Sequence, residues 1–227
     1  MRPLAIIPAY NEEESLASTV DELVASGAPC DYVVINDGSR DRTGEICRDN
    51  GYPCVAHLVN LGLTPGFQTG VRYALAHGYD AVIQFDADGQ HRPEYVAAMV
   101  AEMERTGADI VAGSRFLERP KPVTLRMVGS RLIAGIIRVT TGACLSDPTS
   151  GLRLYGRRAM EEFAYRPDFG PEPDSIAFLI RRGLKVVETQ VEMRDRLAGE
   201  SYLSPAKSVA YMVRMFASVL FAQWFKE

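Results

Sequence analysis

The sequence Asp80-Ala81-Val82-Ile83-Gln84-Phe85 leads directly into Asp86-Ala87-Asp88-Gly89-Gln90-His91. The first part is typical of a short buried strand, and the glycine in the second part predicts a turn after it. In a continuing strand, Asp86, Asp88 and Gln90 would be spaced too widely for all three to coordinate one metal ion, whereas a turn can point them at one place. Their carboxylate and amide oxygens suit Mg²⁺ or Mn²⁺, which is normally shared with phosphates. The alternative is a plain loop, because aspartate and glycine are also the commonest turn residues.

The same alternation of strand, turn and helix extends in both directions from this stretch. Strands are predicted, from apolar and β-branched runs, at residues 4–8, 32–36, 54–58, 80–85, 109–112 and 184–193. Helices are predicted, from capping residues, prolines and terminal glycines, at about residues 11–27, 41–51, 66–77, 93–106, 123–141 and 204–226. The first helix is expected to begin at a pair that resembles a capping box, Asn11 and Glu14.

Repeated strand and helix units predict an α/β fold with a mostly parallel sheet flanked by helices. In such a sheet, ligands bind in the crevice outside the carboxyl ends of the strands. Tyr10, Asp37 and Asp86 each follow a predicted strand, so we expect three strand ends to converge on one site. This convergence favours the metal interpretation of Asp86 and Asp88 over the plain turn.

The composition is that of a globular protein with one large domain, or one domain and a small appendage. The chain has 227 residues, 47% of them hydrophobic and 24% charged, and a formal net charge of -4. That balance gives no reason to expect nucleic acid as a partner. The four cysteines have no zinc-site spacing and are expected to be buried thiols. The N-terminus lacks the pattern of a secretory signal, which predicts a cytoplasmic location.

Two later segments allow more than one interpretation. Asp147-Pro148-Thr149-Ser150-Gly151-Leu152-Arg153 is predicted to be either a complicated chain reversal or a wall that faces a substrate. Residues 204–226 are apolar around most of a helix. Within them, the run from Val209 to Phe225 is short for a membrane span, which needs ~20 apolar residues, and Arg214 and Gln223 interrupt it. This helix is expected to lie in a membrane interface, dock on a small integral-membrane partner, form a homo-oligomer contact, or pack as an ordinary core helix.

Five short motifs occur in an order and spacing that resemble the inverting glycosyltransferases of family 2. They are Ile7-Pro8-Ala9-Tyr10-Asn11-Glu12, Val34-Ile35-Asn36-Asp37-Gly38-Ser39, Asn60-Leu61-Gly62, Asp86 to His91, and Gly113-Ser114-Arg115. Asp147 to Arg153 and Arg196-Leu197-Ala198-Gly199-Glu200-Ser201 are most similar to the polyprenyl-phosphate hexosyltransferase branch, which includes the dolichyl-phosphate mannose synthases. The resemblance covers about residues 3–203.

This resemblance implies a GT-A fold, which is a Rossmann-like sheet with an acceptor-side extension. It also implies a UDP- or GDP-hexose donor bound with Mg²⁺ or Mn²⁺. The residues that would hold the nucleotide are Pro8, Ala9, Tyr10, Glu12, Asp37, Gly38, Asp86 and Ala87. Those that would hold the metal are Asp86, Asp88 and Gln90. Arg115 would meet the donor phosphate, and Arg196 is the expected ligand of an acceptor phosphate.

The acceptor decides whether the reaction needs a general base. A lipid phosphate is already an anion at neutral pH, whereas a sugar hydroxyl must lose a proton to a nearby carboxylate. The candidates for that base are Glu172, Asp174 and Asp147, and an acidic helix start is an equal alternative for the first two. Tyr202 follows Ser201 where many lipid-phosphate members of the family have lysine, which removes one expected positive charge near the acceptor.

The residues and the resemblance together predict a metal-dependent inverting glycosyltransferase, with a catalytic domain at residues 1–203 and an appended helix at 204–227. Asp86, Asp88, Arg115 and Arg196 are expected to act in the transfer. The expected acceptor is polyprenyl phosphate, and the enzyme would be peripheral at the inner face of the cell membrane. Two alternatives are transfer to a sugar hydroxyl in polysaccharide or glycoconjugate assembly, and a scaffold that binds a nucleotide sugar without turning it over.

Overall fold

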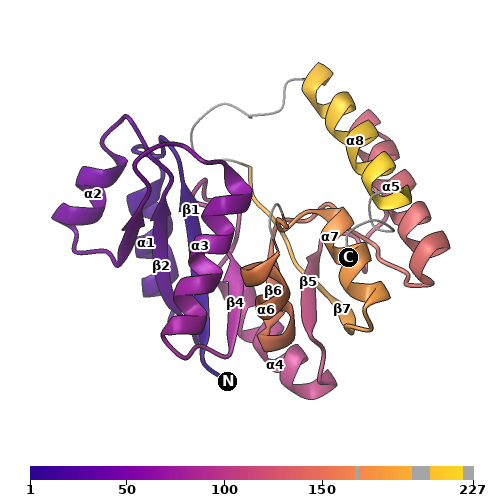
Figure 1. Ribbon diagram of the computed structural model, residues 1–227, viewed down its shortest axis with the longest axis horizontal. Coiled ribbons are helices and arrows are strands. Elements are labelled where there is room, and N and C mark those ends of the chain that lie inside the picture. The colour runs from indigo at the N-terminus through magenta and orange to yellow at the C-terminus, as the bar shows by residue number, and fades with distance from the viewer. Residues whose placement is uncertain (167–168, 196–204, 222–227) are drawn as a thin grey trace.

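The computed structural model describes residues 1–166, 169–195 and 205–221, and it contains a seven-stranded sheet flanked by helices (Figure 1). The strands are β1 (Pro3–Ala9), β2 (Asp31–Asn36), β3 (Cys54–Ala56), β4 (Ala81–Gln84), β5 (Ile110–Ser114), β6 (Arg153–Gly156) and β7 (Val186–Gln190). The helices are α1 (Leu16–Ala25), α2 (Thr43–Asp49), α3 (Leu63–Ala76), α4 (Glu94–Thr106), α5 (Leu125–Thr141), α6 (Arg157–Tyr165), α7 (Pro173–Arg181) and α8 (Pro205–Leu220).

Most neighbouring strands are parallel in the sheet order β3-β2-β1-β4-β6-β5-β7. β1 pairs with β2 and β4, β2 pairs with β3, and β5 pairs with β7, all in parallel. β6 is the exception, since it runs antiparallel to both β4 and β5. The predicted α/β fold with a mostly parallel sheet is therefore confirmed. The carboxyl ends of β1, β2, β4 and β5 lie at one edge, where ligands bind in such sheets.

Apolar side chains alternate between the two faces of the sheet, and helices cover both faces. On β1, Leu4 and Ile6 belong to the core shared with α3, α6 and α7. Ala5 and Ile7 belong instead to the core shared with α1 and α4. α3 lies so close to the sheet that a Cβ on Gly70 would be 2.4 Å from Ile6 Cγ2. These two cores fix the strand ends from which the site is built.

α5 and α8 lie side by side at one end of the molecule, and α7 packs against both (Figure 1). A Cβ on Gly129 of α5 would be 2.9 Å from Sδ of Met212 of α8. Met215 and Val219 of α8 are buried. Among the described helices, none combines the length and the apolarity needed to cross a bilayer. The expected C-terminal helix is thus present and docked on the rest of the chain, while its role at a membrane, partner or oligomer contact stays a prediction.

The predicted start of the first helix at Asn11 is wrong, because α1 begins at Leu16. Asn11 adopts a left-handed backbone with a φ of 56°. The backbone N–H groups of residues 11–13 donate to side-chain oxygens of Ser39 and Asp41 in the loop after β2 and of Thr43 at the start of α2. The polar residues that suggest a helix cap therefore join two loops at the edge of the sheet instead.

Two other expectations are corrected by the structure. The segment before residue 153 leads into β6, an antiparallel strand that the apolar pattern did not predict because only two of its residues, Leu154 and Tyr155, are apolar. The cysteines are free thiols, but they are not all buried. Cys47 is buried and Cys30 half-buried, whereas Cys54 and Cys144 are exposed.

Candidate active site

The acidic turn after β4 is stabilised by hydrogen bonds between its own residues and the last residue of β4. Gly89 has a φ of 74°, as expected for a turn. Gln84, the last residue of β4, donates from Nε2 to Asp86 Oδ1 at 3.0 Å. The backbone N–H of Asp86 donates to Nδ1 of the buried His91 at 2.9 Å, so a neutral His91 carries its proton on Nε2. That nitrogen lies 3.7 Å from Asp86 Oδ2. Gln84 thus orients the Asp86 carboxylate, and His91 holds the Asp86 backbone.

Asp88 and Gln90 belong to the same turn. Asp88 is buried, and its Oδ1 accepts the backbone N–H of Gln90 at 3.0 Å. Gln90 Nε2 donates to the carbonyl of Arg194 at 3.3 Å, and the N–H of Arg194 donates to the carbonyl of Gln90 at 3.1 Å. Arg194 in turn forms an ion pair with Glu22 of α1 at 2.7 Å. The turn is therefore fixed between α1 and the segment after β7.

The ligand set of this turn fits Mg²⁺ or Mn²⁺ rather than a metal that prefers sulfur. Asp86, Asp88 and Gln90 supply carboxylate and amide oxygens. Within the described part of the chain, no three His, Cys, Asp or Glu side chains form a metal site by themselves. The turn thus suits a cation that completes its coordination with water and substrate phosphate, as Mg²⁺ usually does. The buried Oε1 of Gln84 has no hydrogen-bond partner, and a hydrated cation would satisfy such an acceptor.

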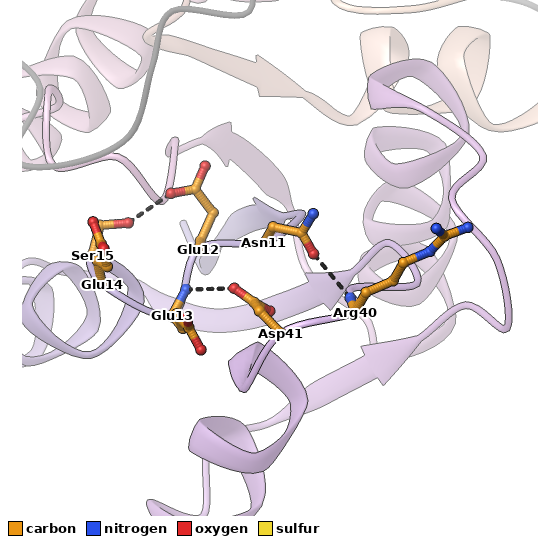
Figure 2. A pocket seen from close by; sticks show the side chains of 7 residues that line it. All are labelled: Asn11, Glu12, Glu13, Glu14, Ser15, Arg40 and Asp41. Atoms are coloured by element: carbon orange, nitrogen blue, oxygen red, sulfur yellow. Dashed lines mark hydrogen bonds between the residues drawn. The ribbon is translucent and has the colours of Figure 1, made fainter.

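A pocket lies between the loops that follow β1 and β2 (Figure 2). It is lined by Asn11, Glu12, Glu13, Glu14, Ser15, Arg40 and Asp41. Asn11 Oδ1 accepts the N–H of Arg40 at 2.9 Å, and Asp41 Oδ2 accepts that of Glu13 at 3.1 Å. Burial raises the pKa of Asp41, but hydrogen bonds from Thr43 and Glu13 outweigh this effect and lower the pKa overall. The walls of the pocket are therefore already connected to each other.

The remaining residues expected at the nucleotide lie along the same edge of the sheet. Pro8 and Ala9 are the last two residues of β1. Tyr10 follows them and is 41% exposed, so its ring is accessible to a ligand. Glu12 accepts a hydrogen bond from the residue just before α1 at 2.6 Å, and Ala87 is buried in the acidic turn.

Asp37 follows β2 and anchors the loop after β3. Its Oδ1 accepts the N–H of Leu61 at 2.9 Å and lies 2.7 Å from His57 Nδ1. Its Oδ2 accepts the N–H of Gly62 at 2.7 Å. Gly38 has a φ of 67°, and a Cβ there would lie 2.4 Å from the backbone of the same loop. Both residues therefore set the shape of the edge where the nucleotide is expected.

Arg115 follows β5 and is bound by Asp147. Its Nε and an Nη donate to the two carboxylate oxygens of Asp147 at 2.6 and 2.9 Å. Asp147 is fully buried, and Glu188 of β7 accepts the N–H groups of Ser146 and Asp147 at 2.6 and 2.8 Å. Both carboxylate oxygens of Asp147 are thus occupied by the guanidinium in a two-point pair. This geometry favours a role for Asp147 in orienting Arg115 over a role as the general base.

The loop before β6 passes from Arg115 to the acidic turn. A Cβ on Gly151 would lie 3.2 Å from Asp86 Oδ2, so the loop backbone runs directly against that carboxylate. Arg153 is buried and donates to the carbonyls of Pro148 at 2.6 Å and Pro171 at 2.8 Å. The loop is thus held in place, and it forms a wall between the two charged groups of the site.

The other two candidate bases lie at the start of α7 and connect it to α8. Asp174 accepts a hydrogen bond from Ser218 Oγ at 2.6 Å. Glu172 forms an ion pair with Arg214 at 3.4 Å. These contacts agree with the interpretation of both residues as an acidic helix start. Arg196, the expected ligand of an acceptor phosphate, lies outside the described residues.

Three polar residues that order the site have no role in the sequence interpretation. His91 holds the Asp86 backbone and is itself part of the acidic motif, so its position was a usable signal. His57 bridges Asp37 and Thr69 Oγ1, at 2.9 Å from the latter, and Glu188 holds the backbone of Asp147. Both lie on other elements of the chain, and no local pattern connects them to their partners.

Comparison with known proteins agrees with this arrangement. The profile of glycosyl transferase family 2 matches residues 4–163. The undecaprenyl-phosphate mannosyltransferase of Micrococcus luteus is 32% identical in an alignment 239 positions long, which covers 99% of this chain and 96% of the relative. The polyprenol monophosphomannose synthase of Mycolicibacterium smegmatis is 29% identical over 217 residues, or 89% of this chain and 81% of the relative.

Solved structures give the same fold. Glucosyl-3-phosphoglycerate synthase from Mycobacterium tuberculosis superposes with a TM-score of 0.70 and 20% identity, covering 97% of this chain and 79% of that one. A crystal structure of the same synthase contains Mn²⁺ and uridine diphosphate, and superposes with a TM-score of 0.69. The profile match, the relatives and the shared sheet lead to one conclusion. The chain belongs to glycosyl transferase family 2 and is a glycosyltransferase.

Proposed function

We propose that this enzyme transfers a hexose from a UDP- or GDP-sugar to a polyprenyl phosphate, with inversion at the anomeric carbon and with Mg²⁺ or Mn²⁺. The donor would lie along the edge formed by Tyr10, Asp37 and the acidic turn. The acceptor would approach from the side of Arg115. Relatives whose names include a polyprenyl-phosphate acceptor support this choice, since one of them aligns with 99% of the chain.

One observation carries the choice of acceptor: each candidate general base is engaged by another group. Asp147 is paired with Arg115, Asp174 is bound by Ser218, and Glu172 is paired with Arg214. A sugar hydroxyl would need a carboxylate able to accept its proton. A phosphate monoester needs only to be positioned, because it is already an anion. The site supports the second kind of acceptor better.

The proposed reaction follows from this arrangement. An oxygen of the acceptor phosphate forms a bond to the anomeric carbon while the bond from that carbon to the nucleoside diphosphate breaks. No proton is transferred, and negative charge develops on the leaving diphosphate. A bound divalent cation would stabilise that charge as a Lewis acid. Asp86 and Asp88 would hold it, and His91 and Gln84 keep Asp86 in place. Arg115, with its guanidinium fixed by Asp147, would face the phosphates.

We also propose that the enzyme works peripherally at the inner face of the membrane, where a polyprenyl chain is anchored. Val128, Leu132 and Val139 of α5 are 42%, 58% and 85% exposed. Their spacing puts them on one face of the helix. On α8, Val213 and Phe216 are also exposed. An apolar stripe of this kind suits an interface between protein and lipid, and co-sedimentation with lipid vesicles would detect it.

The experiment that tests the function measures which acceptor receives the sugar. Purified enzyme is incubated with tritium-labelled UDP-glucose or GDP-mannose, Mg²⁺ or Mn²⁺, and undecaprenyl phosphate, and the label is partitioned between butanol and water. We expect label in the organic phase that depends on the lipid phosphate and is absent with undecaprenol. Label found only in a water-soluble saccharide acceptor would overturn the proposal in favour of transfer to a hydroxyl. Donor binding without turnover on any acceptor would favour a scaffold.

A further inference from the structure

Lys121 is a half-buried lysine in the segment between β5 and α5. Its Nζ donates to Ser130 Oγ on α5 at 3.0 Å. Within the described part of the chain, no carboxylate forms an ion pair with it. Accepting the proposed function, we propose that Lys121 binds the phosphate of the lipid acceptor and makes the enzyme specific for a phosphorylated lipid.

The first step of the argument is the set of polar groups around Lys121. Ser130 Oγ, which accepts from Lys121, lies 3.2 Å from Thr149 Oγ1. Thr149 Oγ1 donates to Asp147 Oδ1 at 3.1 Å, and Asp147 holds Arg115. The lysine and the arginine therefore belong to one chain of hydrogen bonds. This chain joins α5, the loop before β6 and the end of β5.

Both cations contact the same aromatic ring. The guanidinium carbon of Arg115 lies 5.2 Å from the centre of the Phe116 ring, and Nζ of Lys121 lies 5.6 Å from the same centre. Cations are attracted to the face of such a ring. An Nη of Arg115 also lies 3.5 Å from Thr149 Oγ1, which is 3.2 Å from Ser130 Oγ, the acceptor of Lys121. Two positive groups held in this way can contact different oxygens of one phosphate.

The local balance of charge leaves room for an anion. Burial lowers the pKa of Lys121, and the nearby Arg115 and Arg131 lower it further, while Asp147 and Glu188 act in the opposite direction. Arg131 donates to the carbonyl of Lys121 at 2.8 Å. The three cations are thus opposed by two carboxylates, and Asp147 is already paired with Arg115. A phosphate at this place would add negative charge opposite the three cations.

The position of this cluster suits an acceptor rather than the donor nucleotide. The loop before β6 contains both Thr149, which is part of the cluster, and Gly151, which touches Asp86. A phosphate at Lys121 would thus lie across this loop from the acidic turn. The sequence also has Tyr202 where many lipid-phosphate members of the family have lysine. Lys121, about 80 positions earlier in the sequence, would supply a positive charge in its place.

The test separates binding from turnover. Calorimetric titration with farnesyl phosphate, farnesol and inorganic phosphate is carried out on the wild type, Lys121→Met and Lys121→Arg, beside the undecaprenyl phosphate transfer assay. Lys185→Met is the matched control, because Lys185 donates to the carbonyl of Thr106, outside the cluster. We expect Lys121→Met to weaken farnesyl phosphate binding by about tenfold or more and to raise the acceptor KM, as expected for loss of a charged hydrogen bond. Lys121→Arg should keep most of the wild-type affinity for farnesyl phosphate, and both Lys121 variants should bind nucleotide as the wild type does.

Each outcome of this test decides a separate claim. If the wild type transfers sugar to lipid phosphate and Lys121→Met is equal to it in affinity and KM, the inference fails and the function stands. If farnesyl phosphate binding depends on Lys121 but no transfer occurs, the inference stands and the function fails. Wild-type binding of farnesol equal to that of farnesyl phosphate overturns the inference, and so does an equal loss in Lys185→Met. Binding of inorganic phosphate as tight as that of farnesyl phosphate would contradict specificity for a lipid.

Discussion

At the scale of single residues, the site is a set of charged side chains whose partners fix what each can do. Asp86 is kept in place by Gln84 and His91, whereas Asp147 is occupied by its pair with Arg115. The two carboxylates are chemically identical in the sequence. Their different surroundings separate a group that can bind a cation from one that can only orient an arginine.

Replacement of Asp88 by asparagine should leave the fold intact and reduce catalysis. The amide oxygen of the new side chain can still accept the N–H of Gln90, which Asp88 accepts at 3.0 Å, but the substitution removes one negative charge from the expected cation site. We expect metal-dependent donor binding and kcat/KM to fall by about tenfold or more, as for loss of a charged interaction. Steady-state kinetics over a range of Mg²⁺ and Mn²⁺ concentrations measure this change.

The matched control is Asp80→Asn, at the other end of β4, where Oδ2 of Asp80 accepts the N–H of Arg2 at 2.7 Å. It makes the same chemical change away from the site, so its activity should stay close to that of the wild type. Unchanged activity of Asp88→Asn at limiting metal would remove Asp88 from the cation site. An equal loss in both variants would point to stability instead.

Single residues also show how far the site can be predicted from sequence. Asp86, Asp88 and Gln90 form one turn, and a local motif is enough to bring them together. Arg115 and Asp147 meet across 32 positions of sequence, and no local pattern records that contact. The motif placed Asp147 near the site, but only the fold shows that Arg115 occupies its carboxylate.

At the scale of elements, the regular helices and strands are the predictable part. Apolar runs and terminal glycines place most of them to within a few residues, because both signals are local. The errors occur where tertiary contacts replace local ones. The loop after β1 bonds to the loop after β2 and delays α1 to Leu16. β6 lies between β4 and β5 and pairs with both, so these tertiary contacts, not a local apolar run, make it a strand.

The contact between α3 and β1 predicts opposite effects for two glycine substitutions. Gly70→Ala would place a Cβ 2.4 Å from Cγ2 of the fully buried Ile6. This overpacking should lower the free energy of unfolding by about 1–3 kcal/mol. Gly135→Ala, within α5, has nothing within 4 Å of the added Cβ. It should raise the free energy of unfolding by up to ~1 kcal/mol through helix propensity.

Urea unfolding of the two variants beside the wild type measures both changes. The two substitutions are chemically identical and both lie in helices, so the difference between them reports on the α3–β1 contact alone. A Gly70→Ala protein as stable as the wild type would show that α3 lies farther from β1 than the structure places it.

At the scale of the whole molecule, one sheet carries two sites that meet at its edge. β1, β2 and β4 end at the predicted nucleotide site, while β5, the loop before β6 and α5 hold the cationic groups. α8 packs against α5 and α7 at the end of the molecule that carries these cationic groups (Figure 1). This division explains why donor binding and acceptor binding can be changed by different residues. The choice of base, sugar and lipid depends on pocket shape, which no short motif encodes.

The central claim is a donor site at the acidic turn that binds a nucleotide only with a divalent cation. The most direct measurement is the thermal stability of the wild type with UDP, GDP, CDP or dTDP, each with Mn²⁺, Mg²⁺ or EDTA. A ligand that binds only the native state must raise its melting temperature. We expect a rise with UDP or GDP that requires Mn²⁺ or Mg²⁺ and is reduced in Asp88→Asn. An equal rise in EDTA, or none with any nucleotide, would contradict it.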